Sequence, residues 1–408
     1  MGNRKGYTTG SCCAAGTGAA LTYILGGIKA ESWQMSGPTG IDISVPVFNV
    51  EKISEYKARV TVIKDGGDDP DITTGSAVIV NAELSGFNEI DRIEKIKGET
   101  GYRLNERVYL KTGRGIGIVT KPGLSCPVGK GAVNPVPRQM ILKEAEKLME
   151  KYSYEGAVIL DVSIPDGEAL AEKTFNPMLG IKGGISVLGT TGQVDPMSSK
   201  AVLDTIKVQL SVAGKSGKSE TCVITPGNYG IDFLEKAESN REYKGKGFEL
   251  LKSLPKENII KVGNFIGDGV LMAADVGFRH IIISGHLGKM IKVAGGMLDT
   301  HSKYGDNRIE TAVRIINEIY HEDDREELCD SIREAVVVDE ILNLVISKGG
   351  NELLKKFSDR AGKMAEKTLW NNLEKEGIDC GKIDKSMMIF TNRYGLIYRS
   401  GIFKQENL

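Results

Sequence analysis

The sequence has little of several features that mark particular protein classes. Its 408 residues carry a formal net charge of −1, and only 6% of them are aromatic, so no overall field attracts nucleic acid or an anionic membrane. No apolar run is long enough to cross a bilayer, and the first residues, MGNRKGYTTGS, contain no apolar signal core. We therefore expect a cytoplasmic protein with two or three domains that binds neither nucleic acid nor a membrane.

Cysteine and histidine are also scarce, which argues against a metal bound by the protein. None of the six cysteines forms a C-x-x-C pair, and none of the four histidines has the spacing of a metal motif. Free thiols in a reducing compartment are expected. The loop at residues 65–71 holds four aspartates, whose oxygens suit a hard cation, but its spacing is not that of an EF-hand. A turn whose aspartates accept backbone N–H groups is the favoured interpretation.

The first part of the chain alternates strand patterns with only a few helices. A helix is expected through residues 12–20, ending at Gly26-Gly27, and another over 137–151. Period-two patterns predict strands within 41–63, 76–84, 107–112 and 157–164. This mixture predicts an α+β domain over residues 1–178. Gly16 and Gly18 weaken the first helix by roughly 1 kcal/mol each, which suggests close approach of another backbone or a flat ligand.

After residue 178 the pattern becomes a short apolar strand, a glycine loop and a helix. It occurs four times, with strands at 184–189, 221–225, 259–264 and 280–284. This is typical of parallel βαβ units, which bind ligands at the carboxyl ends of their strands. Residues 325–378 are expected to be helical, and 387–403 to form a closing strand pair. The second domain is predicted over 179–408.

The glycine loops of the second domain suggest a cofactor site. Glycine lets backbone approach a ligand, and a helix N-terminus offers N–H groups to a phosphate or a carboxylate. No Walker A sequence is present, and a tight strand-to-helix turn is the alternative for each loop. The candidate cofactor residues are Gly189, Thr190, Thr191, Gly192, Asp195, Gly227, Asn228 and Asn264.

A basic segment lies in the first domain. Residues 101–138 contain seven lysines and arginines against the single carboxylate Glu106, a balance of +6. Such a segment suits a ligand with several carboxylates, although a solvated basic surface gives the same pattern. The strongest candidates for contact with such a ligand are Arg103, Lys111 and Arg114.

Eight short motifs, in order along almost the whole chain, resemble those of the CbiD family. They are GYTTGSC at 6–12, GDDPD at 67–71, GTTG at 189–192, PGN at 226–228, NFIG at 264–267, GH at 285–286, THSK at 300–303 and NRYG at 392–395. The resemblance implies a cobalt-precorrin-5B (C-1)-methyltransferase of anaerobic cobalamin biosynthesis, with S-adenosylmethionine as methyl donor. It also implies an N-terminal α+β domain followed by a Rossmann-like domain with a mostly parallel sheet.

Two features depart from the family pattern. Gly16-Thr17-Gly18 interrupts a helix that is usually a run of alanines, and Thr74 stands where many relatives carry histidine, so we assign that position no catalytic role. Cobalt is expected only as part of the corrinoid substrate. The substrate's carboxylates are expected at Thr8, Thr9 and Ser11 as well as at the basic segment, and proton handling is expected from His286, Asp299 or His301.

Two other functions fit the residues without the resemblance. A nucleotide-dependent enzyme would use the glycine loops, and a non-catalytic tetrapyrrole carrier would use the basic segment alone. The oligomeric state, including a homo-oligomer, and a transient handover of the corrinoid to neighbouring pathway enzymes stay open.

Overall fold

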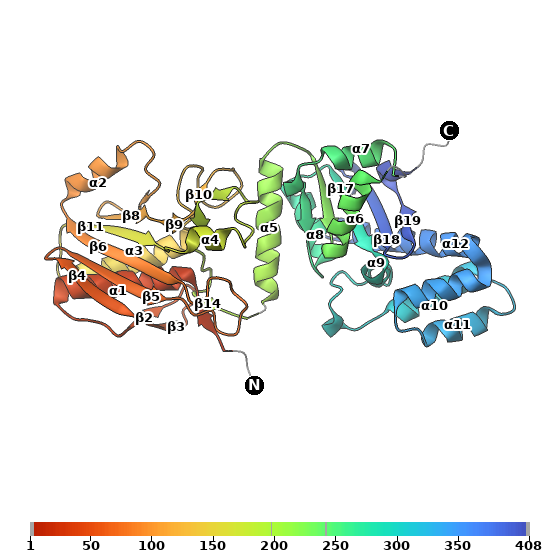
Figure 1. Cartoon of the computed structure of the whole chain (residues 1–408), viewed down its shortest axis with the longest axis horizontal. Coiled ribbons are helices and arrows are strands. Elements are labelled where there is room, and N and C mark those ends of the chain that lie inside the picture. Colours follow the sequence, from red (N-terminus) through yellow and green to blue (C-terminus); the bar gives the residue numbers. More distant parts are fainter. Residues whose placement is uncertain (1–3, 197, 241–242, 405–408) are drawn as a thin grey trace. The chain divides into compact units, whose positions relative to one another are not determined.

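The computed structural model describes residues 4–196, 198–240 and 243–404. The chain is a mixed α/β protein of two units, Met1–Ser199 and Lys200–Leu408 (Figure 1). No helix in the described part of the chain is long and apolar enough to span a membrane.

A six-stranded mixed sheet forms the centre of unit 1. Its order is β4-β5-β6-β11-β8-β7, with β11 and β8 parallel and every other neighbouring pair antiparallel. Alternate residues of β5 and β6 are buried, as period-two patterning requires. The strands are β4 (Asn49–Ser54), β5 (Lys57–Ile63), β6 (Ala77–Ser85), β7 (Tyr102–Arg103), β8 (Val108–Thr112) and β11 (Ala157–Ser163).

Helices cover both faces of this sheet. Helices α1 (Thr9–Gly26) and α3 (Pro135–Lys151) pack on the face that carries Val80, Leu110 and Leu160. Helix α2 (Phe87–Glu94) packs on the opposite face against Tyr109 and Ile159. The short helix α4 (Gly167–Ala171) follows β11. The α+β character predicted for this part of the chain agrees with these elements.

The glycines of α1 let it lie close to its neighbours. A Cβ at Gly16 would be 2.6 Å from Cγ2 of Val80, and one at Gly18 would be 2.1 Å from Cε2 of Trp33. Because Thr9 to Thr22 are buried, the helix is enclosed along most of its length. The predicted close approach is therefore present, but side chains of the same unit occupy the space instead of a second backbone or a ligand.

The boundary between the units lies 21 residues later than the predicted 178/179, at Ser199/Lys200. Three short strands after residue 178 pair with strands of unit 1: β12 with β10, β13 with β9, and β14 with β1. This pairing makes the segment part of the first unit. The small strands of unit 1 are β1 (Gly6–Tyr7), β2 (Ser32–Ser36), β3 (Asp42–Pro46), β9 (Gly115–Ile116), β10 (Ile118–Val119), β12 (Ile181–Lys182), β13 (Gly184–Ile185) and β14 (Gln193–Val194).

Unit 2 is built on a five-stranded sheet in the order β16-β15-β17-β18-β19. The first four strands are parallel, and β19 is antiparallel to β18. All five residues of β15 are buried, as expected for a strand covered on both faces. The strands are β15 (Thr221–Thr225), β16 (Ile259–Lys261), β17 (His280–His286), β18 (Asp384–Thr391) and β19 (Gly395–Arg399).

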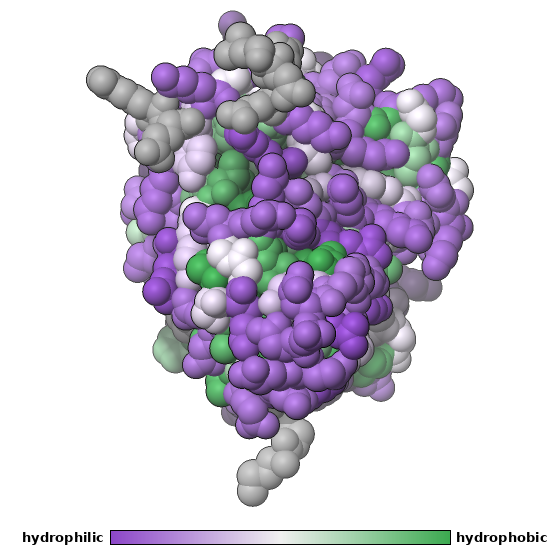
Figure 2. Space-filling model, turned by 90° about the vertical axis from the view of Figure 1, so that its right-hand side faces the viewer, coloured by the Kyte–Doolittle hydropathy of each residue, from purple (hydrophilic) through white to green (hydrophobic). Residues whose placement is uncertain are grey.

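Two groups of helices enclose this sheet. Helices α6 and α7 pack on the face of Val223 and Ile282, and the other helices contribute to the core on the face of Ile224 and Ile283. The helices are α5 (Ser199–Lys215), α6 (Asn228–Ser239), α7 (Lys246–Ser253), α8 (Ile266–Val276), α9 (Leu287–Ala294), α10 (Arg308–Ile319), α11 (Arg325–Arg333) and α12 (Val338–Lys375). Figure 2 shows a mostly hydrophilic surface on one side of the molecule, interrupted by a few apolar areas.

Three of the four predicted strand–loop–helix units are confirmed, beginning at β15, β16 and β17. The first is wrong, because the strand expected at 184–189 is only the two-residue β13, which pairs with β9 of unit 1. The fourth parallel strand of the sheet is instead β18. The predicted closing pair around 392–395 is β18 and β19.

Candidate functional site

The carboxyl ends of the parallel strands in unit 2 form the first candidate site. The chain runs from β15 outward to β16 and then returns past β15 to β17. The connection after β15 thus leads to one side of the sheet, and the connection after β17 leads to the other, toward β18. The gap between the two strands is a topological switch point, and open α/β sheets bind ligands at such points. Gly227-Asn228 follows β15 at the start of α6, and Gly285-His286 ends β17. Two of the predicted cofactor residues thus lie at the switch point.

His286 lies at the end of β17 and caps α9. Its Nδ1 accepts the N–H of Gly288 at 3.1 Å, which leaves the imidazole proton on Nε2 when the ring is neutral. Its ring centre is 5.6 Å from that of Tyr229 and 5.7 Å from that of Phe390. Burial lowers the pKa of His286, against the opposing charge of Asp339. The site therefore presents a neutral imidazole beside an aromatic ring.

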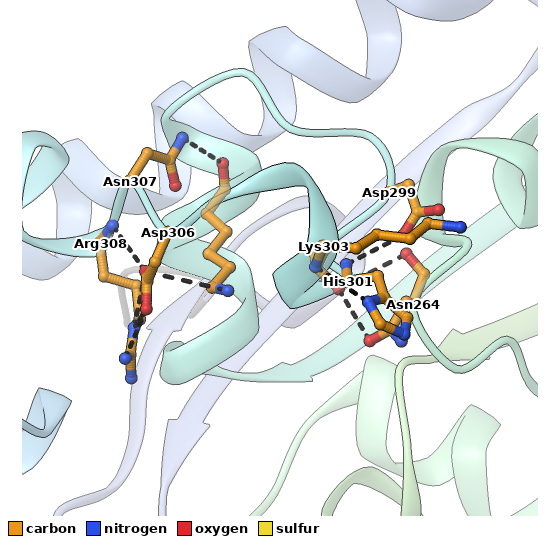
Figure 3. Close-up of polar contacts among 9 residues, drawn as sticks. Asn264, Asp299, His301, Lys303, Asp306, Asn307 and Arg308 are labelled. Carbon is orange, nitrogen blue, oxygen red and sulfur yellow. Dashed lines mark hydrogen bonds and ion pairs between the residues drawn. The ribbon is translucent and has the colours of Figure 1, made fainter. Parts of the chain in front are cut away.

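The segment after α9 returns to the end of β16 through an isolated bridge between Asp299 and Phe265, and brings together Asn264, Asp299 and His301 (Figure 3). Thr300 N–H donates to the Asn264 carbonyl at 3.0 Å. Asp299 Oδ1 accepts the His301 N–H at 2.9 Å, and His301 Nδ1 accepts the Lys303 N–H at 3.1 Å. These bonds hold the backbone from Thr300 to Lys303, and the one to His301 Nδ1 caps the turn at 302–304. Asn264 is therefore a neighbour of Asp299 and His301 at one sheet edge, although 35 residues separate it from Asp299 in the sequence.

Asp268, in the first turn of α8, lies beside this group. Burial and the charge of Asp299 together raise the pKa of Asp268. A raised pKa in a carboxyl group beside a second carboxylate makes it a candidate for holding a proton. Sequence reasoning did not single it out, because its closeness to Asp299 arises only from the bridge between Phe265 and Asp299.

Two further residues at this edge were not predicted. Tyr229, in the first turn of α6, is 60% exposed although its ring lies beside His286. Lys289, in the first turn of α9, donates to Pro226 O, Gly263 O and Asn264 Oδ1 at 3.2, 3.0 and 2.9 Å. The sequence shows a lysine three residues after His286, but only the fold shows which loops it reaches.

The predicted cofactor loop 189–192 does not end a strand of this sheet, so its assignment to the second domain is wrong. The loop packs on the N-terminus of α1 in unit 1, where Gly192 O accepts both the Thr8 N–H and the Ser11 hydroxyl, at 3.1 and 2.5 Å. A Cβ at Gly189 would be 2.4 Å from Oγ1 of Thr8. Thr190 and Asp195 are exposed nearby. The glycines therefore allow close packing within unit 1.

The start of α1 is occupied by its own chain. Thr8 accepts the Ser11 N–H and caps the helix, and the Gly10 N–H donates to Leu188 O at 2.8 Å. Thr9 is 6% exposed and Ser11 is fully buried. Thr9 and Ser11 therefore present little surface to a substrate, and the N–H groups of Gly10 and Ser11 already have acceptors; that these residues bind substrate carboxylates stays a prediction.

The basic segment is only partly available to a ligand. Arg103 is paired with Asp91 and Glu94, each at 2.9 Å, so its charge is neutralised within unit 1. Arg114 is exposed, and no acceptor for its side chain is found among the described residues. Of the three arginine and lysine candidates, Arg114 and Lys111 thus remain open to substrate.

Lys111 lines a depression of about 230 Å³ on the α2 face of the unit 1 sheet. It is the cross-strand neighbour of Asp161, whose Oδ1 is buried without a hydrogen-bond partner in the described structure. Burial raises the pKa of Asp161, while the charge of Lys111 opposes that shift. The depression therefore combines a cation with an unpaired carboxyl oxygen.

The acidic loop is held by hydrogen bonds and ion pairs. Asp65 pairs with Arg4 and accepts the Gly67 N–H at 2.8 Å, and Asp71 pairs with the buried Lys64 and accepts the Thr73 N–H at 2.8 Å. The predicted turn with N–H acceptors is confirmed. No group of three or more metal-ligating side chains occurs within the described ranges.

Comparisons with known proteins give one consistent result. The CbiD family profile matches residues 1–196. A protein of Ruminiclostridium cellulolyticum, named cobalt-precorrin-5B C(1)-methyltransferase, is 38% identical over 75% of this chain and 70% of its own length. One of Alkaliphilus metalliredigens with the same name is 33% identical over 97% and 91%. A solved structure, described as cobalamin biosynthesis protein (cbiD) from Archaeoglobus fulgidus, is 26% identical, covers 76% of this chain and 84% of its own, and has a TM-score of 0.34.

Proposed function

The chain belongs to the CbiD family, and on that premise we propose that it methylates cobalt-precorrin-5B at C-1 to give cobalt-precorrin-6A in anaerobic cobalamin biosynthesis. The observation that carries this proposal is that a relative with that name is similar over 97% of this chain and 91% of its own length. The similarity therefore extends across the residues of both units.

We propose S-adenosylmethionine as the methyl donor and the switch point of unit 2 as its site. The parallel order of β16, β15, β17 and β18 supports a Rossmann-like interpretation of this sheet. The exposed ring of Tyr229 offers a stacking surface for adenine. The backbone N–H groups of Gly227 and Asn264 have no acceptor among the described residues, and such donors suit the donor's carboxylate.

Unit 1 supplies the groups that suit the corrinoid substrate. Precorrins carry several carboxylate side chains, and Arg114 and Lys111 are the cations of the basic segment that stay open to them. We propose that these two side chains hold substrate carboxylates by charge-assisted hydrogen bonds. Arg103 contributes little, because two carboxylates already neutralise it.

The chemical demand on the protein is small, because the sulfonium of S-adenosylmethionine supplies an already activated methyl group. The new bond joins the methyl carbon to C-1, the S–CH₃ bond breaks with its electron pair going to sulfur, and the macrocycle loses one proton. The side chains must hold the reacting atoms close together and exclude water. Among the predicted catalytic residues, we propose Asp299 as the acceptor for that proton, because its Oδ1 accepts the His301 N–H and no partner of its Oδ2 is found among the described residues. His286 and His301 are further candidates, but each must first release the backbone N–H that its Nδ1 accepts.

The free, buried state of all six cysteines agrees with a reducing compartment. On this ground we propose a cytoplasmic location.

Mass spectrometry of cobalt-precorrin-5B incubated with the purified protein tests the proposed function. A gain of one methyl group only in the presence of S-adenosylmethionine is expected. An unchanged mass, with folded protein and verified substrate, would refute the methyltransferase and favour a tetrapyrrole carrier. Methyl transfer that requires a nucleoside triphosphate would favour the nucleotide-dependent enzyme.

A further inference from the structure

One lysine joins the ends of three adjacent strands in unit 2. Lys289 extends from the first turn of α9, after β17, and its ammonium donates to Pro226 O after β15 and to Gly263 O and Asn264 Oδ1 after β16. An ammonium group has three N–H donors and no acceptor. All three donors are therefore used within the protein, so Lys289 has none left for a ligand.

These bonds determine which way the neighbouring peptide groups face. No cis peptide bond occurs in the described chain, and in a trans peptide the C=O and the following N–H point in opposite directions. Because Pro226 O and Gly263 O point toward the ammonium, the N–H groups of Gly227 and Asn264 point away from it. Neither N–H has an acceptor in the described structure.

The side chain of Asn264 is oriented in the same way. Its Oδ1 accepts from Lys289 at 2.9 Å and from Thr300 Oγ1 at 3.4 Å, so its NH₂ group is turned from both and has no acceptor among the described residues. Lys289 thus gathers oxygen acceptors around a positive charge and leaves N–H donors on the outside. Such an edge favours an anionic ligand group.

We propose that Lys289 is a positioning residue that arranges the donors of Gly227 and Asn264 to bind the carboxylate of the methyl donor. The proposal rests on the proposed function, because it names the part of S-adenosylmethionine that this edge recognises. Lys289 itself acts through the loops and does not touch the ligand.

Two ligands that differ in the aminocarboxylate group separate this role from a general structural one. We suggest calorimetric titration of S-adenosylhomocysteine and of 5′-methylthioadenosine, which lacks that group, into the wild type, Lys289→Met and Lys292→Met. Lys292 is a matched control, because it lies on the same helix, is 8% exposed and pairs with Asp306 at 3.8 Å, with no hydrogen bond to the loops after β15 or β16 found in the described structure.

Lys289→Met should lower the affinity for S-adenosylhomocysteine by about 10- to 100-fold, the usual effect of losing charge-assisted hydrogen bonds. The affinity for methylthioadenosine should stay unchanged. Lys292→Met should change neither affinity. Equal loss for both ligands, no loss for either, or the same loss in Lys292→Met would overturn the proposal. A wild type that binds neither ligand would instead refute the proposed donor site itself.

A second variant covers the case in which Lys289→Met does not fold by circular dichroism. Lys289→Arg keeps the charge, but its planar guanidinium cannot direct donors as a tetrahedral ammonium does. We expect this variant to lose about tenfold in affinity for S-adenosylhomocysteine and none in affinity for methylthioadenosine. Wild-type affinity for both ligands would refute the positioning role.

Discussion

Substitution of Gly18 by alanine tests how tightly α1 is enclosed in unit 1. The indole of Trp33 lies against Gly18, so an alanine Cβ would be 2.1 Å from Cε2 and 2.5 Å from Nε1. The indole must therefore move. Its Nε1–H donates to Glu144 Oε2 at 2.9 Å, and Glu144 is only 3% exposed. The movement breaks a hydrogen bond to a buried carboxylate.

The expected change in the free energy of unfolding combines one stabilising effect with two destabilising ones. Alanine gains roughly 1 kcal/mol in helix propensity over glycine. Overpacking costs about 1–3 kcal/mol, and loss of a hydrogen bond to a charged group costs about 1.5–3 kcal/mol. The free energy of unfolding of unit 1 should therefore fall by about 1.5–5 kcal/mol.

The assay is urea unfolding followed by far-UV circular dichroism, with the transition of unit 1 fitted separately because a two-unit chain need not unfold in one step. The matched control is the same substitution in a Trp33→Ala background. Without the indole, Gly18→Ala should instead stabilise unit 1 by roughly 1 kcal/mol. A destabilisation of equal size in both backgrounds would refute the argument from the Trp33 contact.

Three other predictions concern charge. Asp71→Asn should destabilise unit 1 by about 3–5 kcal/mol in urea unfolding, because it leaves the ammonium of Lys64, 2% exposed, buried without its partner. Burial raises the pKa of Asp71, but the charge of Lys64 and the hydrogen bonds from Lys64 and Thr73 lower it by more, so the net shift is downward. The stabilisation from this carboxylate is therefore present above the ordinary pKa of 3.8 and is lost as the pH falls through the folded pKa. An Asp71→Asn variant with the acid sensitivity of the wild type would contradict this prediction. Arg114→Glu should weaken the binding of cobalt-precorrin-5B in a titration without changing the affinity for S-adenosylhomocysteine, whereas Arg103→Ala should change neither affinity. A larger loss of cobalt-precorrin-5B affinity in Arg103→Ala than in Arg114→Glu would point to Arg103 as the substrate contact. Because burial keeps the pKa of His286 below its ordinary 6.5, the rate of methyl transfer should show no loss from His286 protonation at about pH 7. A fall in the pH–rate profile that has its midpoint above pH 6.5 and disappears in His286→Gln would contradict this.

The local elements were predictable because their signals are local. The strand at 221–225 and the helix at 287–294 have the predicted bounds, since a short apolar strand and a glycine loop before an apolar helix are read within a few residues. The motifs at 226–228, 264–267 and 285–286 also lie together at one sheet edge. That followed from a general property of parallel sheets, whose carboxyl ends meet on one side.

The loop at 189–192 shows where local signals were insufficient. A glycine loop after an apolar stretch has the same pattern whether it faces a ligand or packs on a helix. In this chain Gly192 O accepts from Thr8 and Ser11, which lie more than 180 residues earlier. Only the pairing of β14 with β1 brings these segments together, and no pattern within either segment records it.

The sequence by itself determined the family, the α/β composition and the residues at the unit 2 sheet edge, because periodicity, glycine loops and ordered motifs depend on neighbouring residues. The tertiary structure alone decided which charged groups are free. Arg103 and Arg114 look equivalent in the sequence, yet only Arg103 meets Asp91 and Glu94. Lys289 likewise finds oxygen acceptors that lie 25 and more residues away in the sequence, because side-chain partners are set by which strands become neighbours.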